Sequence, residues 1–149
     1  SFQAGVRAHY VASVFAAPIM IAQRSGLIVN TSFFAAQKDS SGVIYGIAKS
    51  ASDRMAATMA HDLREYRVAA VSLYPGLVRT ESIMKAADFF DLSNSESPQF
   101  IGRAVAALAN DPNILQKSGK VLVAAALALE YGFTDIDGKQ PRPLTMEDL

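Results

Sequence analysis

Apolar residues recur along this chain at two spacings, one typical of helices and one typical of buried strands. Near the beginning, Tyr10, Val14 and Phe15 follow the three-to-four-residue repeat of an amphipathic helix. The short β-branched run at residues 27–29 is instead typical of a strand that is buried on both faces. The pattern predicts helices over residues 5–21, 45–66 and 98–109, and strands over residues 27–29, 68–73 and 120–124.

Prolines and glycines mark where these elements should bend or end. Pro18 is expected to kink or break the first helix, because proline has no N–H for the helical ladder. Gly26 is expected to be the left-handed residue that ends it. Small residues such as Ala48 and Ser52 would let another helix approach the second helix closely. The apolar stripe of that second helix is formed by Ile47, Ala51, Met55, Met59 and Leu63.

Helices and strands alternate along the whole chain, which is the order that gives a parallel sheet with helices packed on it. The sequence therefore predicts one α/β domain over residues 1–149, with right-handed crossovers. Residues 130–149 form a polar tail in this interpretation, and the carboxylates of residues 130–138 are expected in a solvated turn.

Composition excludes several classes of partner and site. The 149 residues are 50% apolar and 19% charged, with 14 basic and 14 acidic side chains, so no electrostatic grip on nucleic acid is expected. The chain has no cysteine, which excludes disulfides and thiolate metal sites and favours a reducing, cytoplasmic location. The two histidines give no short metal motif, and no metal is expected. The apolar stretch of residues 10–22 is interrupted and too short to predict a membrane span.

Candidate chemistry lies in the motif Tyr-x-x-x-Lys formed by Tyr45 and Lys49. Side chains four positions apart lie on the same side of a helix, one turn apart. A neighbouring ammonium lowers the pKa of a phenol, which can then exchange a proton with a substrate oxygen. A surface tyrosine and lysine at this spacing is the better interpretation when the motif is taken alone. Here, however, the motif opens a helix, follows a buried strand that ends in Ser32, and precedes the turn Pro75-Gly76.

With these elements in this order, the chain resembles the carboxyl-terminal half of the short-chain dehydrogenase/reductase family. Residues 6–10, 71–76 and 131–138 are most similar to the dehydrogenase/reductase member 1 subgroup. The resemblance implies a Rossmann-like, doubly wound parallel sheet with flanking helices, of which the N-terminal βαβ units are missing. It also implies an NAD(P)-dependent oxidoreductase that acts on a small carbonyl or alcohol, with NAD or NADP as cofactor.

The same resemblance implies a role for each matching residue. Tyr45 would be the catalytic acid/base, Lys49 would hold the nicotinamide ribose, and Ser32 would bind the substrate oxygen. The residues expected to line or bond the nicotinamide end are Pro75, Gly76, Val78 and Thr80. Residues 80–90 would cover the substrate, and the first two long helices would form a homodimer or tetramer interface.

The chain departs from the family pattern at three places. The second position of the usual serine pair holds Phe33, so Ser32, 13 positions before Tyr45, is our candidate. The active-site asparagine of the family falls near Gln3. The first two βαβ units are absent, and with them the glycine-rich dinucleotide loop and the fourth strand. In the family that fourth strand pairs with the strand at residues 27–29, which is therefore expected at an exposed sheet edge. We therefore expect this fragment alone to be marginal, oligomeric or insoluble, and inactive. The alternative function is a non-catalytic remnant of the family that acts as a dimerisation or interaction module.

Overall fold

The computed structural model describes residues 2–38 and 42–148 of the chain. A short π-helical turn, Gln3–Arg7, leads directly into the first α-helix. The helices are α1 (Ala8–Gln23), α2 (Val43–Asp62), α3 (Glu81–Lys85), α4 (Pro98–Ala109) and α5 (Ala124–Tyr131). The strands are β1 (Gly26–Thr31), β2 (Val68–Tyr74) and β3 (Val121–Val123).

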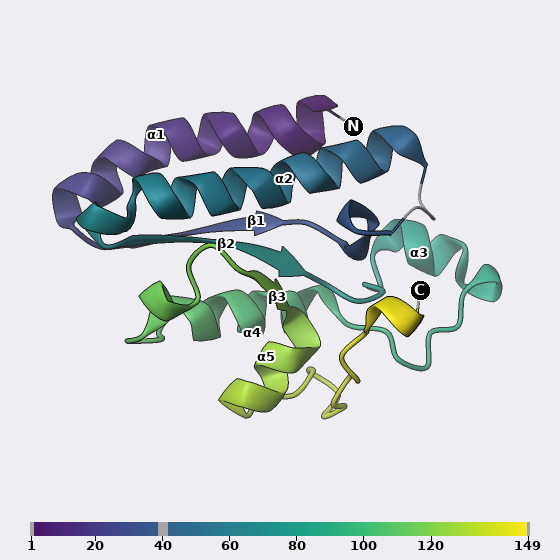
Figure 1. The fold of residues 1–149 in the computed structure, drawn as a ribbon. Helices are drawn as coiled ribbons and strands as arrows, with labels where there is room; N and C mark the ends of the chain where they lie inside the picture. Colours follow the sequence, from purple (N-terminus) through teal and green to yellow (C-terminus); the bar gives the residue numbers. More distant parts are fainter. Residues whose placement is uncertain (1, 39–41, 149) are drawn as a thin grey trace.

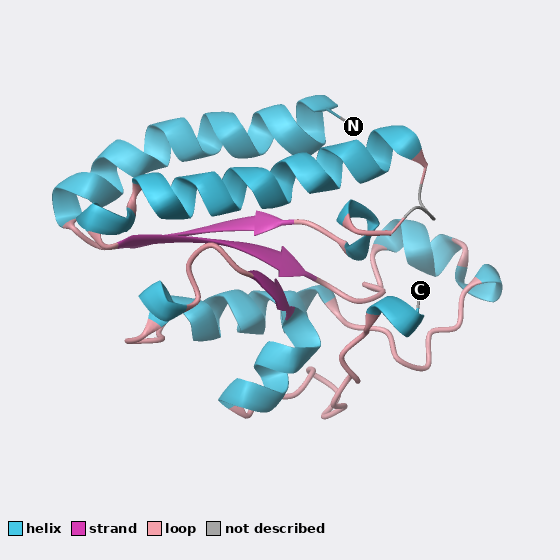
Figure 2. Cartoon of the chain, in the orientation of Figure 1, coloured by secondary structure: helices cyan, strands magenta, loops and turns pink. Residues whose placement is uncertain are grey.

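The three strands form one parallel sheet in the order β1-β2-β3, as Figures 1 and 2 show. Ile28 lies opposite Ala70 in the register, and Ser72 lies opposite Val121. The helices α1 and α2 cover one face of the sheet, and α4 and α5 cover the other (Figure 1). This arrangement confirms the predicted α/β fold with a parallel sheet and flanking helices.

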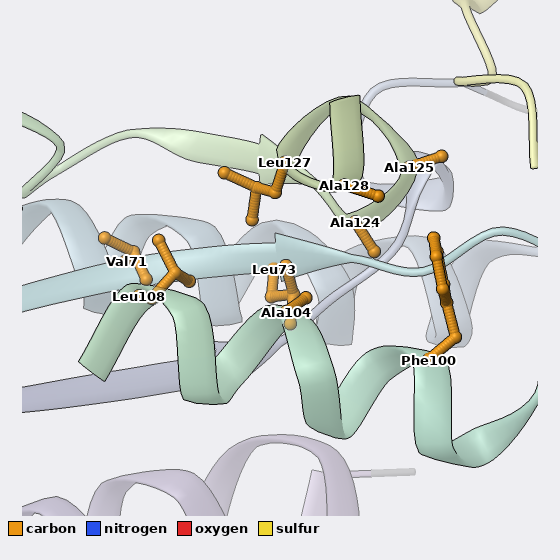
Figure 3. Close-up of a cluster of buried hydrophobic side chains, with 9 residues drawn as sticks. All are labelled: Val71, Leu73, Phe100, Ala104, Leu108, Ala124, Ala125, Leu127 and Ala128. Atoms are coloured by element: carbon orange, nitrogen blue, oxygen red, sulfur yellow. The ribbon is translucent and has the colours of Figure 1, made fainter. Parts of the chain in front are cut away.

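Each face of the sheet has its own apolar core. Val71 and Leu73 point from β2 toward α4 and α5, where they meet Phe100 and Leu108 (Figure 3). On the other face, Val68 and Ala70 pack with residues of α1 and α2. All seven residues of β2 are buried, because this strand is the central one and has helices on both sides. The end of β2 is therefore rigidly placed, and it leads into the candidate site.

The first helix ends differently from the prediction. Arg24, with φ of 51°, is the left-handed residue, and its N–H bonds the carbonyls of Met20 and Ile21. Gly26 is instead the first residue of β1. A β-carbon there would lie 2.5 Å from the Met20 side chain, so close packing, and not backbone conformation, requires the glycine. Gly26 does follow the end of the helix, as predicted. The prediction that it is the left-handed residue was wrong, because Arg24 takes that conformation.

The first helical run is also longer and more continuous than predicted. It passes through Pro18 without ending and begins at Gln3, so that 21 residues, Gln3–Gln23, are helical. By length and composition alone this run could cross a membrane. Helices packed within a fold meet the same two conditions, and this one packs against α2 and β1 (Figure 1).

The buried face of α2 is rotated from the predicted apolar stripe. Ile47 is 48% exposed, whereas the fully buried positions of α2 are its small residues. These are Ala48, Ser52, Ala56 and Ala60. Small side chains let the π-helical turn and the sheet approach α2 closely. The predicted stripe is turned outward at Ile47, whereas Met59 and Leu63 pack into the core at the other end of the helix. The expectation that another helix would approach this small-residue face is confirmed.

The C-terminal part contains order that the sequence pattern did not predict. The helix α5 follows β3 without a loop, where no helix was expected. Its alanine-rich face packs on α4 and joins the core in Figure 3. Farther along, Asp135 is 2% exposed, so the expectation of a solvated turn fails at this residue.

Candidate active site

The start of α2 places the two residues of the predicted acid/base pair side by side. Gly42, with φ of 80°, turns the chain into α2, and Tyr45 is the third residue of that helix. Lys49 follows one turn later, and its Nζ lies 5.5 Å from the centre of the Tyr45 ring. The phenol is 40% exposed and therefore accessible to a ligand.

A pocket of about 330 Å³ opens beside this pair. We call it the Tyr45 pocket, and it is lined by Ala4, Gly5, His9, Thr31, Tyr45, Ala48 and Lys49. The lining comes from the first helical run, the end of β1 and the start of α2. Lys49 Nζ donates a hydrogen bond of 3.2 Å to the Thr31 carbonyl, which fixes the ammonium at the carboxyl end of a parallel strand. Open α/β sheets place their ligands at this end.

The pKa values of the titratable groups in the pocket are shifted, and the shift of Tyr45 is not the one expected from the sequence. Burial raises the pKa of the Tyr45 phenol above its ordinary value. Burial also lowers the pKa of the Lys49 ammonium, while the charge of Asp53 opposes that shift. For His9, burial and then the positive charge of Lys49 lower the pKa. The shift of the Tyr45 pKa is therefore upward, opposite to the expected depression, because the phenol is half-buried.

Ser32 does not reach the Tyr45 pocket. Its hydroxyl is buried and donates to the backbone carbonyl of Lys49 at 3.1 Å, on the inner side of α2. Phe33, the alternative at this register, is half-buried and packs edge-on against Phe34. The hydroxyl-bearing residue that does line the pocket is Thr31. Gln3 opens the π-helical turn nearby.

The other predicted residues follow β2 and do not line the Tyr45 pocket. Pro75 is buried, and Val78 forms an isolated parallel bridge with Glu96. Thr80 caps α3, accepting a hydrogen bond of 3.4 Å from the N–H of Ile83. Tyr74, the last residue of β2, packs against Phe34 and donates to Asp53.

Sequence reasoning missed a buried polar cluster on this segment. Its members are Arg79, Ser95, Glu96, Ser97 and Asp135, and we call it the Glu96–Asp135 network. Four of the five are at most 3% exposed. They come from parts of the chain up to 56 positions apart, so no local spacing could have indicated them.

The residues of the Tyr45 pocket fit one end of a dinucleotide. A phenol and an ammonium, the latter held by the Thr31 carbonyl, lie together there, and both can donate hydrogen bonds to a sugar hydroxyl or a carbonyl oxygen. The chain offers no glycine-rich turn for a diphosphate.

Comparisons with known proteins place these observations in a family. The model of the family described as short chain dehydrogenase matches residues 1–89. Dehydrogenase/reductase SDR family member 1 of Mus musculus is 45% identical over 148 residues, covering 91% of this chain and 47% of that protein. The Homo sapiens protein of the same name is 39% identical, with the same coverage. The chain thus spans about half the length of the curated relatives it matches.

Solved structures give the same result for the fold. A structure titled short chain dehydrogenase/reductase family protein is 31% identical with a TM-score of 0.71, and the match covers 82% of this chain and 53% of that one. A 7α-hydroxysteroid dehydrogenase in complex with NADH and 7-oxo glycochenodeoxycholic acid is 22% identical, with a TM-score of 0.67 and coverage of 80% and 50%. ElxO with NADP bound is 20% identical, with a TM-score of 0.70 and coverage of 80% and 53%.

Proposed function

Because this chain belongs to the short-chain dehydrogenase/reductase family, we propose that it is the catalytic half of an NAD(P)-dependent carbonyl reductase or alcohol dehydrogenase. The observation that carries the proposal is the pairing of Tyr45 with Lys49 in an open pocket at the end of β1. The substrate is a small molecule with a carbonyl or an alcohol group.

Tyr45 is the proton donor in the direction of reduction. Burial raises the pKa of its phenol, so the proton stays on the oxygen at neutral pH and is available for the substrate carbonyl. The Lys49 ammonium then stabilises the phenolate that remains, and the Thr31 carbonyl keeps that ammonium in place. When bound, the cofactor supplies the hydride.

Two hydroxyl residues have separate roles in this proposal. Thr31 lines the pocket and acts through its backbone carbonyl, which accepts the hydrogen bond from the Lys49 ammonium. Ser32 acts through the backbone, because its hydroxyl holds the Lys49 carbonyl and so the turn of α2 that carries the ammonium. Substrate binding by Ser32 itself would require this hydroxyl to leave α2.

The cofactor is NAD or NADP. Two solved structures with the same fold carry NADH and NADP in their titles, which supports a nicotinamide cofactor without choosing between the two. Lys49 and Tyr45 would hold the ribose, and the residues of the turn after β2 would line the nicotinamide. These residues are Pro75, Gly76, Val78 and Thr80.

Titration of this chain with NADH, followed by nucleotide fluorescence, tests the cofactor role. We expect Tyr45→Phe to leave binding nearly unchanged, because the ring and Lys49 remain. Lys49→Ala should weaken binding by about 10–100-fold, the usual effect of removing a charged hydrogen-bond partner. Tyr10→Phe, which changes an exposed tyrosine of α1, is the matched control. Equal binding by Lys49→Ala and the parent would contradict the proposal.

Turnover tests the proton transfer. It is measured in a protein that also carries the part of the relatives' length that this chain does not span. There, Tyr45→Phe should lower turnover by about 10²–10⁴-fold, the contribution typical of general acid/base catalysis. Unchanged turnover in Tyr45→Phe would contradict the assignment of Tyr45.

A second candidate function is a non-catalytic dimerisation module, favoured by the outward apolar face of α1 and α2. Phe15 and Val43 are 74% and 75% exposed on these helices. The same face supports a homodimer or tetramer of an active enzyme. Loss of NADH binding together with retained self-association would favour the module over the enzyme.

A further inference from the structure

We infer that Glu96 is a positioning residue for the turn after β2, and that Asp135 anchors this arrangement from the C-terminal segment. The two carboxylates would thus belong to the support of the nicotinamide site, although neither lies in the Tyr45 pocket. The inference rests on the proposed function only in its last step, where the turn is taken to line the nicotinamide.

Glu96 holds the turn through its side chain and its backbone. Its carboxylate accepts a hydrogen bond of 2.8 Å from the N–H of Gly76, directly after Pro75. Its own N–H donates to the Leu77 carbonyl at 2.8 Å, and its carbonyl accepts from the N–H of Arg79 at 2.8 Å. Three backbone groups of the turn, at Gly76, Leu77 and Arg79, are therefore hydrogen-bonded to this one residue.

The carboxylate also explains why position 76 is glycine. A β-carbon built there would lie 2.8 Å from Glu96 Oε1 and 3.1 Å from its carboxyl carbon. Glu96 is 2% exposed, so its side chain has little room to move aside. The absence of a side chain at Gly76 thus makes space for Glu96 itself, and it brings the N–H of the turn within reach of the carboxylate.

Asp135 connects the C-terminal segment to the same structure. One of its carboxylate oxygens lies 3.2 Å from Arg79 Nη2 and accepts the N–H of Ser97 at 2.8 Å. The other oxygen accepts the Ser97 hydroxyl, which in turn accepts the Phe100 N–H at the start of α4. Asp135 therefore joins the residues beside Glu96 and the start of α4 through buried bonds, and it joins the turn through a partly buried contact with Arg79.

Arg79 completes the network from the turn side. Its Nη1 donates to the Ser95 carbonyl at 2.8 Å and to the Ser95 hydroxyl at 2.9 Å. Asp137, on the C-terminal segment, lies 3.9 Å from its Nη2. The charged groups near Glu96 are thus Arg79 from the turn and Asp135 from the C-terminal segment, and both act on its carboxyl.

The contact most specific to the inference is the bond between the Glu96 carboxylate and the Gly76 N–H. Hydrogen exchange of the Gly76 amide, followed by NMR on the ¹⁵N-labelled chain, measures it directly. We expect Glu96→Asp to speed exchange at Gly76 at least tenfold, because the shorter side chain keeps its charge but cannot reach this amide. Glu96→Gln, whose amide oxygen can still accept the bond, should leave exchange within about twofold of the parent.

Amides of α2 serve as the internal reference, since they do not depend on Glu96. Unchanged exchange at Gly76 in Glu96→Asp would overturn the positioning role. Should Glu96→Asp fail to fold, Ser97→Ala gives the second test, because it removes the hydroxyl that bonds Asp135 and that also caps α4. Exchange at Gly76 should then rise at least threefold, and no rise would overturn the anchoring role of Asp135.

NADH titration of the same variants tests the last step. Glu96→Asp should weaken binding at least tenfold, whereas Glu96→Gln should restore it to within about threefold of the parent. Equal NADH binding by the parent, Glu96→Asp and Glu96→Gln would show that Glu96 positions the turn but that the turn does not bind the cofactor. That result would overturn the cofactor part of the inference. Failure of the parent to bind NADH would instead count against the proposed function, while the exchange measurements still decide the positioning role.

Discussion

Lys49 is held among groups that act on its charge in opposite directions. Its ammonium donates to the Thr31 carbonyl, and Asp53 raises its pKa, while burial lowers it. His9 faces the same pocket and has its own pKa lowered by burial and by Lys49. The protonation of these two residues is thus coupled across the space between α1 and α2.

This coupling can be measured in the isolated chain. Because the chain has only two histidines, a His61→Gln variant assigns both imidazole signals in a proton NMR titration. We expect the pKa of His9 to lie below 6.5 and to rise in Lys49→Met, which removes the positive charge. Arg54→Met, farther along α2, is the control. A His9 pKa that is the same with and without Lys49 would show that the two groups do not interact.

Glu96 should give the chain an unusual pH dependence of stability. Burial, and after it the charge of Asp135, raise the pKa of its carboxyl from 4.5 to about 7, against a hydrogen bond from Gly76 and the charge of Arg79. A pKa raised on folding means that the folded state binds more protons than the unfolded state between these values. The contribution of Glu96 is therefore complete below pH 4.5 and is lost as the pH rises to about 7.

The full size of this effect is about 3 kcal/mol, from a shift of about 2.5 pKa units. Urea unfolding at pH 5 and pH 7.5 measures it, and Glu96→Gln should reduce the difference in the free energy of unfolding between the two. Glu65→Gln changes an exposed carboxylate and is the control. An equal pH dependence in Glu96→Gln and the parent would mean that this carboxyl does not titrate abnormally.

At the residue scale, sequence spacing predicted contacts between residues one helical turn apart, and it missed contacts between residues far apart in the sequence. Tyr45 and Lys49 are one helical turn apart, so their contact follows from helix geometry alone. The direction of the Ser32 hydroxyl depends instead on how closely α2 approaches the end of β1. The burial of Asp135 depends on Arg79, 56 positions earlier, and no periodicity records such a pairing.

At the scale of elements, close packing between α1 and β1 sets where each begins and ends. Gly26→Ala would bring a β-carbon within 2.5–2.7 Å of three Met20 side-chain atoms, and we expect it to cost about 1–3 kcal/mol, as overpacking usually does. Gly102→Ala in α4 is the matched control, because nothing lies within 4 Å of its added carbon. That change should stabilise the chain by up to about 1 kcal/mol through helix propensity.

Thermal or urea unfolding of the two variants separates these effects. Equal stabilities for Gly26→Ala and Gly102→Ala would show that Met20 moves aside and that the packing around β1 is loose.

Helices with a strong apolar periodicity were predicted correctly, whereas helices and buried faces that depend on close packing of small residues were not. α4, with Pro98 at its start and three buried apolar residues, was found at its predicted bounds. α5 was missed because its alanines carry no clear apolar stripe and it follows β3 without a turn residue. In α2, alanine and serine are buried because they allow close approach, and hydrophobicity alone could not indicate that face.

At the scale of the whole molecule, one edge of the sheet and one helical face lack a partner within the described residues. β1 pairs with β2 on one side only, and its other edge carries no strand of this part of the chain. The outer face of α1 and α2 exposes several large apolar side chains. These are Tyr10, Val14, Phe15, Ile19, Val43, Ile44 and Ile47. Exposed edges and apolar patches of this kind favour association with another chain.

We therefore expect the chain to self-associate through the α1–α2 face, and sedimentation velocity over a range of concentrations measures this. Phe15→Glu places a charge on the most exposed aromatic of α1 and should shift the chain toward monomer while its melting temperature in dilute solution changes little. Phe89→Glu is the matched control, since Phe89 is 88% exposed and lies beyond α3, away from this face. If both variants associate like the parent, the contact runs through the free edge of β1 instead, because neither substitution touches that strand.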